Sequence, residues 1–236
     1  MKKVSIVGGG IIGLCSAYYL AKEGCQVTLF DQSAMDDGCS YGNAGMIVPS
    51  HIIPLAQPGM IAQGMKWMFD SQSPFYVKPR LSPDLIKWGL QFYKHANAKH
   101  VEKSMPALRD LSLLSKELYQ DFAKVDDSFF YEEKGLLMLY KTDKVANEMY
   151  HEAKEAARLN LEVNYLNPTE VAALENGTKT DVIGGVHYTG DAHLYPQKFL
   201  KFLKKELQQL KVEIHSNTTV EDFIFNQNRI VKVVTN

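Results

Sequence analysis

The sequence predicts an α/β fold, and two of its features carry that prediction. The first is a strand–helix–strand pattern at the amino terminus, which contains a Gly-x-Gly-x-x-Gly motif. The second is the alternation of amphipathic helices with short apolar strands over much of the remaining chain. A β-α-β unit within about thirty residues is the building block of a parallel sheet. We therefore expect a parallel sheet to begin the fold.

The first elements follow from apolar patterning and from glycine. Residues 3–7 are expected to form a buried strand, and residues 11–23 a helix that Gly24 ends. Residues 26–30 are expected to form a second strand, which stops at Asp31.

From Gln32 to about Arg80 the chain is rich in Gly, Pro, Ser and Met and shows little periodicity. Such a long irregular stretch is usually functional or disordered. Its many apolar residues argue against disorder.

Helices and strands then alternate to the end of the chain. We expect helices from Pro83 with Ser82 as N-cap, from about Met105 to Lys124, over 144–159, over 168–175 with Asn167 as N-cap, and after Pro196. We expect strands at 135–140, 161–166, 184–188 and 211–216, followed by a β-hairpin that turns at Asn226–Asn228.

Composition and charge exclude several classes of protein. Hydrophobic residues make up 45% of the 236 residues and charged residues 22%, which is ordinary for a globular protein with a core. The net charge of −1 provides no field that would attract nucleic acid. No apolar run approaches membrane-spanning length. The start MKK followed by apolar residues resembles a signal peptide, but the motif spacing of the glycines and the amphipathic helix after them argue against one.

The three cysteines, Cys15, Cys25 and Cys39, show no metal-binding spacing and no arrangement for nucleophilic catalysis. An odd number of cysteines is typical of a reducing compartment. We expect a cytoplasmic protein without a metal site.

The motif Gly8-Gly9-Gly10-Ile11-Ile12-Gly13 predicts a dinucleotide site. Gly8 permits the tight turn out of the strand, Gly10 lets the backbone approach a pyrophosphate, and Gly13 lets the helix pack closely on the strand. The helix N-terminus offers free N–H groups to the phosphates. Asp31 lies at the end of the second strand, where a carboxylate can accept hydrogen bonds from the ribose hydroxyl groups. The alternative is a glycine-rich turn without a ligand, and the motif alone does not separate FAD from NAD.

The segment after the second strand favours FAD. An NAD-dependent dehydrogenase usually continues into another helix–strand repeat, whereas this chain enters the glycine-containing loop SYGNAGM at residues 40–46. Such a loop is suited to press its backbone against a flat ring system. The alternative interpretation of Asn43 is a turn residue.

The run from Gly8 to Asp31, followed by Ser40-x-x-Asn43-Ala44-Gly45-Met46, resembles the D-amino-acid oxidase superfamily of FAD-dependent amine oxidoreductases. Within that superfamily the sequence is most similar to the bacterial D-amino-acid dehydrogenases, through the segment NAGMIVPSHIIPLAQPGMIAQGMKWMF. The segments GGVHYTGDAHLYPQKFLKFL and VEIHSNTTVEDF extend the resemblance over essentially the whole chain.

The resemblance implies a Rossmann-like FAD-binding domain of residues 1–80 and 190–236, with an inserted antiparallel-sheet substrate domain of residues 81–189. It also implies that a C-terminal part is lacking and the fold incomplete, because members of the family continue beyond the hairpin. We accordingly expect weak FAD binding, little turnover by this chain alone, and a homo-oligomer or a complementing polypeptide.

The chemistry that the resemblance implies is oxidative deamination of a D-amino acid. A hydride passes from the α-carbon to flavin N5, the imine hydrolyses to a keto acid and ammonia, and a respiratory acceptor such as a quinone takes the electrons. D-proline, hydroxy-D-proline, glycine and sarcosine remain alternative substrates, and a peripheral position on the inner membrane face remains an alternative location. The other functional alternatives are a non-catalytic nucleotide-binding subunit and an NAD-dependent dehydrogenase.

The resemblance also assigns roles to residues. The pyrophosphate site would comprise Gly8, Gly10, Ile11, Ile12 and Gly13; the ribose site Asp31 with Gln32 beside it; the flavin site Ser40, Asn43, Ala44, Gly45 and Met46; and the adenine contact the backbone of Val220. His51 is the candidate catalytic residue, although a lone histidine is more often structural. His187 and Tyr188 are expected near the substrate cavity, and Asp191 and His193 in loops or turns.

Overall fold

The computed structural model describes residues 1–62, 64, 82–176 and 178–236, which form two compact units. Unit 1 comprises Met1–Met46, Tyr119–Glu132 and His193–Asn236. Unit 2 comprises Ile47–Leu118 and Glu133–Ala192. The division into a cofactor domain and a substrate domain with the boundaries expected above stays a prediction.

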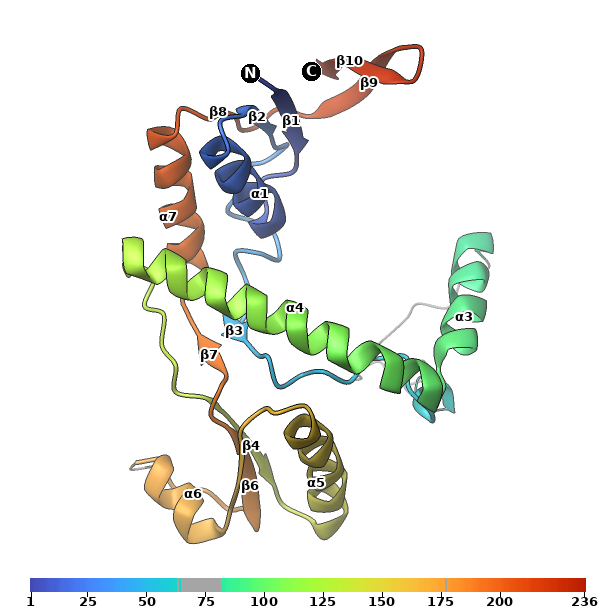
Figure 1. The fold of residues 1–236 in the computed structure, drawn as a ribbon, viewed down its shortest axis with the longest axis vertical. Helices are drawn as coiled ribbons and strands as arrows, with labels where there is room; N and C mark the ends of the chain where they lie inside the picture. The colour runs from blue at the N-terminus through green and yellow to red at the C-terminus, as the bar shows by residue number, and fades with distance from the viewer. Residues whose placement is uncertain (63, 65–81, 177) are drawn as a thin grey trace. The chain divides into compact units, whose positions relative to one another are not determined.

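Unit 1 is built on a three-stranded parallel sheet in the order β1-β2-β8 (Figure 1). Strand β1 (Lys3–Val7) pairs in register with β2 (Gln26–Phe30), and β2 pairs with β8 (Glu213–His215). Helix α1 (Ile11–Lys22) connects β1 to β2. The predicted α/β fold class is thereby confirmed, together with its β-α-β beginning.

Helix α1 ends at Lys22, with Glu23 as its C-cap, and Gly24 follows as the predicted terminating glycine. This glycine has φ of +78°, a left-handed conformation that lacks a steric penalty only for glycine. The N–H of Gly24 donates to the carbonyl of Ala21 at 3.0 Å, and the N–H of Cys25 donates to that of Leu20 at 3.0 Å. These bonds satisfy carbonyl groups at the helix end and lead the chain directly into β2.

An aromatic core holds the helices of unit 1 together. Helix α7 (Pro196–Gln209) packs against α1, and Phe199 is 1% exposed. Its ring lies 4.9 Å from the ring of Phe129 and 5.3 Å from that of Phe122, measured between centroids. Phe122 also meets Tyr18 of α1 at 5.0 Å. Burial of each such ring stabilises the fold by about 1.5–3 kcal/mol.

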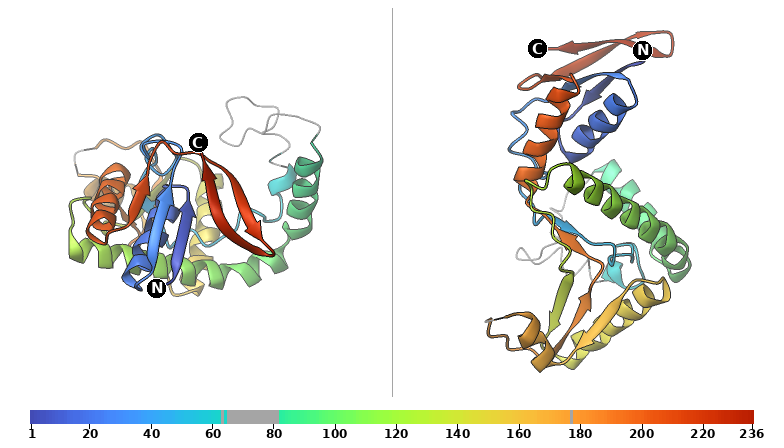
Figure 2. Two further views of the ribbon diagram at one scale, coloured as in Figure 1. Left: turned by 90° about the horizontal axis from the view of Figure 1, so that it is seen from above. Right: turned by 60° about the vertical axis from the view of Figure 1, so that its left-hand side comes forward.

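The carboxyl-terminal segment of unit 1 is the expected hairpin. Strands β9 (Val220–Asn226) and β10 (Arg229–Thr235) pair antiparallel (Figure 2), with irregular register after Ile230 and after Val234.

A separate short pair is formed by β3 (Met46–Ile47) and β7 (Ala192–His193).

Unit 2 contains an antiparallel sheet in the order β4-β6-β5. Its strands are β4 (Leu136–Tyr140), the central β6 (Gly184–Tyr188) and β5 (Val163–Leu166). The helices α5 (Asp143–Arg158) and α6 (Pro168–Leu174) contact β6. The core beneath them consists of Ile52, Met105, Tyr140, Ala146, Ala153, Ala156, Val186 and Tyr188.

The glycines that begin β6 permit close packing inside this sheet. A side chain at Gly184 would place its Cβ 2.5 Å from the hydroxyl of Tyr140 and 2.8 Å from the carbonyl oxygen of Leu166. These separations are shorter than carbon–oxygen contacts allow, so the sheet depends on glycine here.

Helix α4 (Ala98–Val125) is longer than the sequence indicates, so the predicted start near Met105 was wrong. The side chain of Asn97 accepts a hydrogen bond from the N–H of His100 at 3.0 Å, which caps the first turn. Pro106 lies inside the helix, where proline cannot donate a backbone hydrogen bond. The expected start near Met105 rested on apolar periodicity, which does not include the cap at Asn97.

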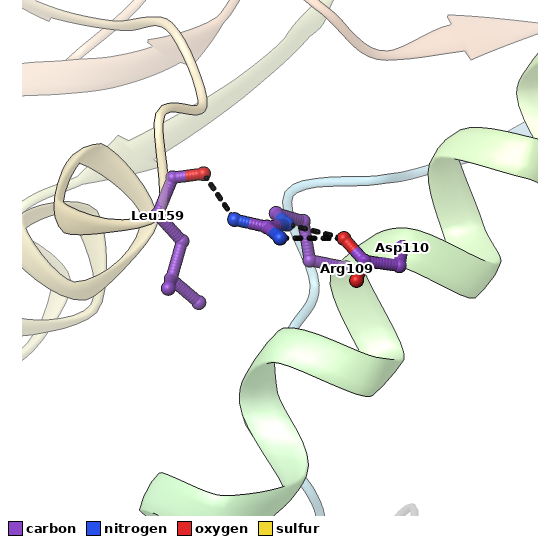
Figure 3. A network of polar contacts seen from close by, with 3 residues as sticks. All are labelled: Arg109, Asp110 and Leu159. Carbon is purple, nitrogen blue, oxygen red and sulfur yellow. Dashed lines mark hydrogen bonds and ion pairs between the residues drawn. The ribbon is translucent and has the colours of Figure 1, made fainter.

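Arg109 joins α4 to the end of α5 within unit 2 (Figure 3). One guanidinium nitrogen donates to the carbonyl oxygen of Leu159 at 3.2 Å, and the group also pairs with the carboxylate of Asp110 at 2.6 Å. The bond to Leu159 satisfies a carbonyl left free at the helix end.

The predicted N-caps differ in how the side chain is used. Asn167 accepts from the N–H groups of Thr169 and Glu170, and Glu170 accepts from the N–H of Asn167 at 2.8 Å, which completes a capping box at α6. Ser82 is the N-cap of α3 (Pro83–His95), but its side chain forms no capping bond.

Within the described residues, no helix is long and apolar enough to cross a membrane.

Candidate cofactor site

The glycine motif forms a tight turn between β1 and α1. Gly8 has φ of +106°, and its N–H donates to the carbonyl of Phe30 at 2.8 Å. A Cβ on Gly13 would overlap the carbonyl oxygen of Gly8, so α1 approaches β1 more closely than any other residue type permits. A Cβ on Gly10 would lie 3.1 Å from the hydroxyl of Ser40.

The N-terminus of α1 is open toward a ligand. The first helical bond runs from the N–H of Leu14 to the carbonyl of Gly10 at 3.0 Å, so the preceding N–H groups lack partners inside the helix. One of these groups, the N–H of Ile11, donates to the hydroxyl of Ser40 at 3.0 Å. Ile12 is 78% exposed. The helix dipole and the remaining N–H groups suit a phosphate.

Asp31 closes the turn from the end of β2. One carboxylate oxygen accepts from the N–H of Gly9 at 2.6 Å, and the other accepts from the N–H and the hydroxyl of Ser33 at 2.8 and 2.9 Å. Burial alone would raise the pKa of Asp31, but these hydrogen bonds, together with the charge of Lys204, hold it below its usual value. The carboxylate is therefore ionised at neutral pH, and the oxygen that bonds to Gly9 retains capacity for a hydroxyl donor.

Contacts from the carboxyl-terminal segment hold this edge of the sheet. The ammonium of Lys204 donates to the carbonyl groups of Ala34 and Met35 at 3.0 and 3.2 Å. The N–H of Thr218 donates to the carbonyl of Asp31 at 2.8 Å. Thr218 precedes Val220, the predicted adenine contact, which lies at the start of β9. Gln32 is exposed beside Asp31.

The loop of residues 40–46 is held by Asn43. Its side-chain oxygen accepts from the N–H of Gly45 at 2.8 Å, and its nitrogen donates to the carbonyl groups of Cys39 and Ser40 at 3.0 Å each. The side chain of Asn43 thus bonds to the backbone of its own loop. Contact of this loop with a flavin ring stays a prediction. Because the Asn43 amide bonds within the loop, the loop backbone is the part expected to contact the ring.

Gly45 anchors the same loop to unit 1. It has φ of +66°, and a Cβ would overlap the carbonyl oxygen of Leu194. The N–H of Leu194 donates to the carbonyl of Gly45 at 2.9 Å. Ala44 and Met46, the neighbours of Gly45, are exposed. The loop therefore has a fixed base and a solvent-facing side.

The described geometry fits the ADP half of a dinucleotide. The residues predicted for the cofactor all fall within unit 1: Gly8, Gly10, Ile11, Ile12, Gly13, Asp31, Gln32, Ser40, Asn43, Ala44, Gly45, Met46 and Val220. The glycine turn between β1 and α1, the open N-terminus of α1 and the ionised carboxylate of Asp31 are the features that bind a pyrophosphate and a ribose in dinucleotide sites. Their roles in binding stay predictions.

The candidate catalytic histidine belongs to unit 2. His51 is exposed, and its Nδ1 lies 3.1 Å from the hydroxyl of Ser50. Ser50 in turn donates to Asp191, which is 1% exposed. Sequence reasoning missed this link, because Ser50 and Asp191 stand 141 residues apart.

The other polar candidates have structural contacts. Tyr188 is 4% exposed in the core of unit 2, where burial, followed by the charges of Glu152 and Asp191, raises its pKa to about 12. The Nε2 of His187 lies 3.1 Å from the carbonyl oxygen of Lys134. Within unit 1, the Nε2 of His193 lies 3.8 Å from Glu132.

The cysteines are free thiols, and burial raises the pKa of Cys15 to about 12, which leaves it unreactive. Across the described ranges, no group of three or more His, Cys, Asp and Glu side chains is placed to hold a metal ion. The stretch Lys66–Phe69, which contributes to the family resemblance, lies outside the described residues.

A parallel β-α-β unit with a glycine turn, an open helix N-terminus and an acidic residue after the second strand defines a dinucleotide-binding protein. The chain belongs to the FAD-dependent oxidoreductase family named DAO, whose sequence profile matches residues 3–236. The resemblance to the D-amino-acid oxidase superfamily is thereby confirmed.

Individual relatives agree with this assignment. The chain is 32% identical over 234 residues to a D-amino acid dehydrogenase of Helicobacter pylori, covering 99% of this chain and 56% of the relative. It is 30% identical over 243 residues to a D-amino acid dehydrogenase of Vibrio atlanticus, covering 99% and 57%. The chain therefore spans little more than half the length of these curated relatives.

Solved structures share the fold at low sequence identity. A glycine oxidase from Bacillus cereus superposes with a TM-score of 0.66 at 17% identity, covering 100% of this chain and 51% of the other. An L-proline dehydrogenase from P. horikoshii superposes with a TM-score of 0.64 at 16% identity, covering 100% and 49%. At such identities the likeness establishes the fold alone.

Proposed function

We propose that this chain carries the FAD-binding part of a flavoenzyme that oxidatively deaminates a D-amino acid. The observation that supports this most directly is the glycine turn of unit 1 with Asp31 ionised beside it. Membership of an FAD-dependent family favours FAD over NAD for that turn. The similarity to two D-amino acid dehydrogenases favours a D-amino acid as the substrate.

Within this proposal, the residues of unit 1 bind and orient the cofactor. The N–H groups at the start of α1 hold the pyrophosphate, Asp31 holds the ribose with Gln32 beside it, and the backbone of Val220 meets the adenine. The loop of residues 40–46 presents its backbone to the flavin. A bound flavin would supply the hydride acceptor for the α-carbon, and the imine product would hydrolyse to a keto acid and ammonia.

His51 is the proposed proton acceptor for the substrate ammonium, because an amine must be neutral before its α-carbon loses a hydride. The electrons are proposed to continue to a respiratory acceptor such as a quinone, and the protein to work in the cytoplasm or on the inner membrane face. D-proline, hydroxy-D-proline, glycine and sarcosine are the alternative substrates within the same chemistry.

The chain spans little more than half the length of the matched relatives, so nucleotide binding without turnover is the second candidate function. Unit 1 would bind FAD in either case, so only the fate of a substrate separates the two candidates.

The test compares this chain with a version extended by any downstream reading frame. Each protein is mixed with FAD, desalted and examined by visible spectroscopy, and is then assayed for dye reduction with a panel of D-amino acids and their L-enantiomers. Flavin bands together with reduction by D-amino acids alone would support the enzyme. Flavin bands without turnover in either version would favour the binding subunit. A protein that stays colourless in both versions would contradict the proposal.

A further inference from the structure

The hydroxyl of Ser50 links a buried carboxylate to the candidate catalytic histidine. Asp191, with 1% of its surface exposed, accepts from the hydroxyl of Ser50 at 2.5 Å and from the N–H of Ser50 at 3.0 Å. The same hydroxyl lies 3.1 Å from the Nδ1 of His51. All three residues belong to unit 2, so these distances do not depend on the other unit.

The direction of these bonds follows from counting protons. A serine hydroxyl carries one proton, and the short distance to Asp191 places that proton on the carboxylate side. The lone pairs of the hydroxyl then face the imidazole, so Nδ1 of His51 must be the donor. A neutral imidazole that is protonated on Nδ1 has its lone pair on Nε2.

This arrangement of donors and acceptors requires Asp191 to be ionised, so that its carboxylate accepts the proton of the Ser50 hydroxyl. Burial raises the pKa of Asp191 above its ordinary value, and the two bonds from Ser50 with the charges of His51 and Lys116 offset that rise only in part. Lys116 itself pairs with Glu133 at 2.8 Å. Because the carboxylate accepts two hydrogen bonds, ionisation near neutral pH leaves no unpaired buried charge.

The backbone holds the three groups at fixed separations. The N–H of His51 donates to the carbonyl of Val48 at 3.1 Å, and the N–H of Ile52 donates to that of Ser50 at 3.0 Å. Ile52 is 1% exposed, and Pro49 is also fully buried. The N–H of Gly135 donates to the carbonyl of Asp191 at 3.0 Å. The backbone around Ser50 and Asp191 is therefore held in place by hydrogen bonds and by buried neighbours.

We propose that Asp191 is a positioning residue that acts through Ser50 to hold His51 as the tautomer protonated on Nδ1. The exposed imidazole thereby presents Nε2 as a proton acceptor in most molecules. The use of that acceptor, removal of a proton from the substrate ammonium, rests on the proposed function. The tautomer itself is a property of unit 2 and does not depend on the proposed function.

The test measures the tautomer directly. The chain is labelled with ¹⁵N-histidine, and long-range ¹H–¹⁵N spectra are recorded at about pH 8.5, well above the ordinary histidine pKa of about 6.5. The variant His51→Gln assigns the signals of this ring. We expect the Nδ1–H form of His51 to exceed the Nε2–H form by about tenfold, as one hydrogen bond to a charge-paired group supports.

Four variants separate this proposal from a merely structural role. Asp191→Asn keeps the size of the side chain, but its new amide nitrogen donates to the hydroxyl of Ser50, which turns the serine proton toward His51. We expect the dominant tautomer to invert to Nε2–H. Ser50→Ala removes the link and should return the His51 ring to the mixture of tautomers of a free histidine. The double variant Ser50→Ala with Asp191→Asn should do the same. Ser50→Thr retains the hydroxyl and should retain the wild-type tautomer.

The matched control is Asp126→Asn, which changes an aspartate of unit 1 that pairs with Lys205 at 3.2 Å. It should leave the His51 signals unchanged. A wild-type protein dominated by the Nε2–H form, or an Asp191→Asn variant with unchanged tautomer, would overturn the proposal. Inversion in a protein whose extended version also binds no FAD and oxidises no D-amino acid would support the positioning role while counting against the proposed function, so the two failures remain distinguishable.

Discussion

At the scale of single residues, Asp31 joins the glycine turn to β2 and couples stability to pH. Its folded pKa lies below the usual value, so the carboxylate stabilises the native state above its unfolded pKa of about 3.9. This contribution is lost as the pH falls through the folded pKa. We predict that Asp31→Asn lowers the free energy of unfolding by up to about 1 kcal/mol at pH 7, discounted for partial exposure.

The measurement is urea unfolding of both proteins at neutral and acidic pH. The difference between wild type and Asp31→Asn should shrink as the pH falls below about 3.9 and should vanish only below the lowered folded pKa of Asp31. A difference that stays constant over this range would show that the charge of Asp31 plays no part. Asp126→Asn serves as a comparison, because its pKa is also lowered but it lies away from the glycine turn.

Gly13 gives a second prediction at the residue scale. An added Cβ would overlap the carbonyl oxygen of Gly8, so Gly13→Ala should shift α1 from β1. We expect a destabilisation of about 1–3 kcal/mol and a loss of FAD binding, measured by denaturant unfolding and by fluorescence titration.

The control is Gly89→Ala in α3, where a Cβ meets nothing within 4 Å. That change should stabilise the protein by up to about 1 kcal/mol, because alanine is the better helix former. Equal effects of the two substitutions would remove the steric argument for Gly13.

The sequence indicated these residues because each acts within a local pattern. Gly8, Gly13 and Asp31 have positions fixed by a single β-α-β unit. Ser33 forms its bonds to Asp31 only two residues away, yet no motif marked it. The links from Lys204 to Met35 and from Ser50 to Asp191 span 169 and 141 residues, and only the folded chain reveals them.

At the scale of elements, apolar periodicity predicted the helices and strands, while helix beginnings depended on caps. Asn167 was predicted as an N-cap from a local signal, whereas the start of α4 was placed near Met105 rather than after Asn97. The first turns of α4 are held by tertiary packing, since Val101 and Met105 pack at the core of unit 2.

The continuity of α4 predicts the sign of a substitution. If the helix passes through Pro106, replacement by alanine restores a backbone donor inside it. Pro106→Ala should then raise the free energy of unfolding by about 1 kcal/mol or more, after allowance for the greater freedom of the unfolded chain. Thermal unfolding followed by circular dichroism measures this change. A helix that started at Pro106 would instead lose stability on the same replacement.

At the scale of the whole molecule, the two units divide the proposed work. Unit 1 contains every residue proposed for the cofactor, and unit 2 contains His51 with the groups that orient it. Family membership extends over residues 3–236, while the relatives have nearly twice that length. The sequence predicted the fold class and the family, and it could not predict the contacts of Ser50 because they cross the fold.

The central claim is that unit 1 binds the ADP half of FAD through the glycine turn and Asp31. Isothermal titration calorimetry of this chain with FAD, ADP and FMN tests it directly, because only FAD and ADP contain the adenosine diphosphate. We predict that ADP binds within about tenfold of FAD, a difference below about 1.4 kcal/mol, and that FMN binds at least about a hundredfold more weakly. Binding of FMN as tight as that of FAD, or no binding of FAD and ADP at about 1 mM, would contradict the account.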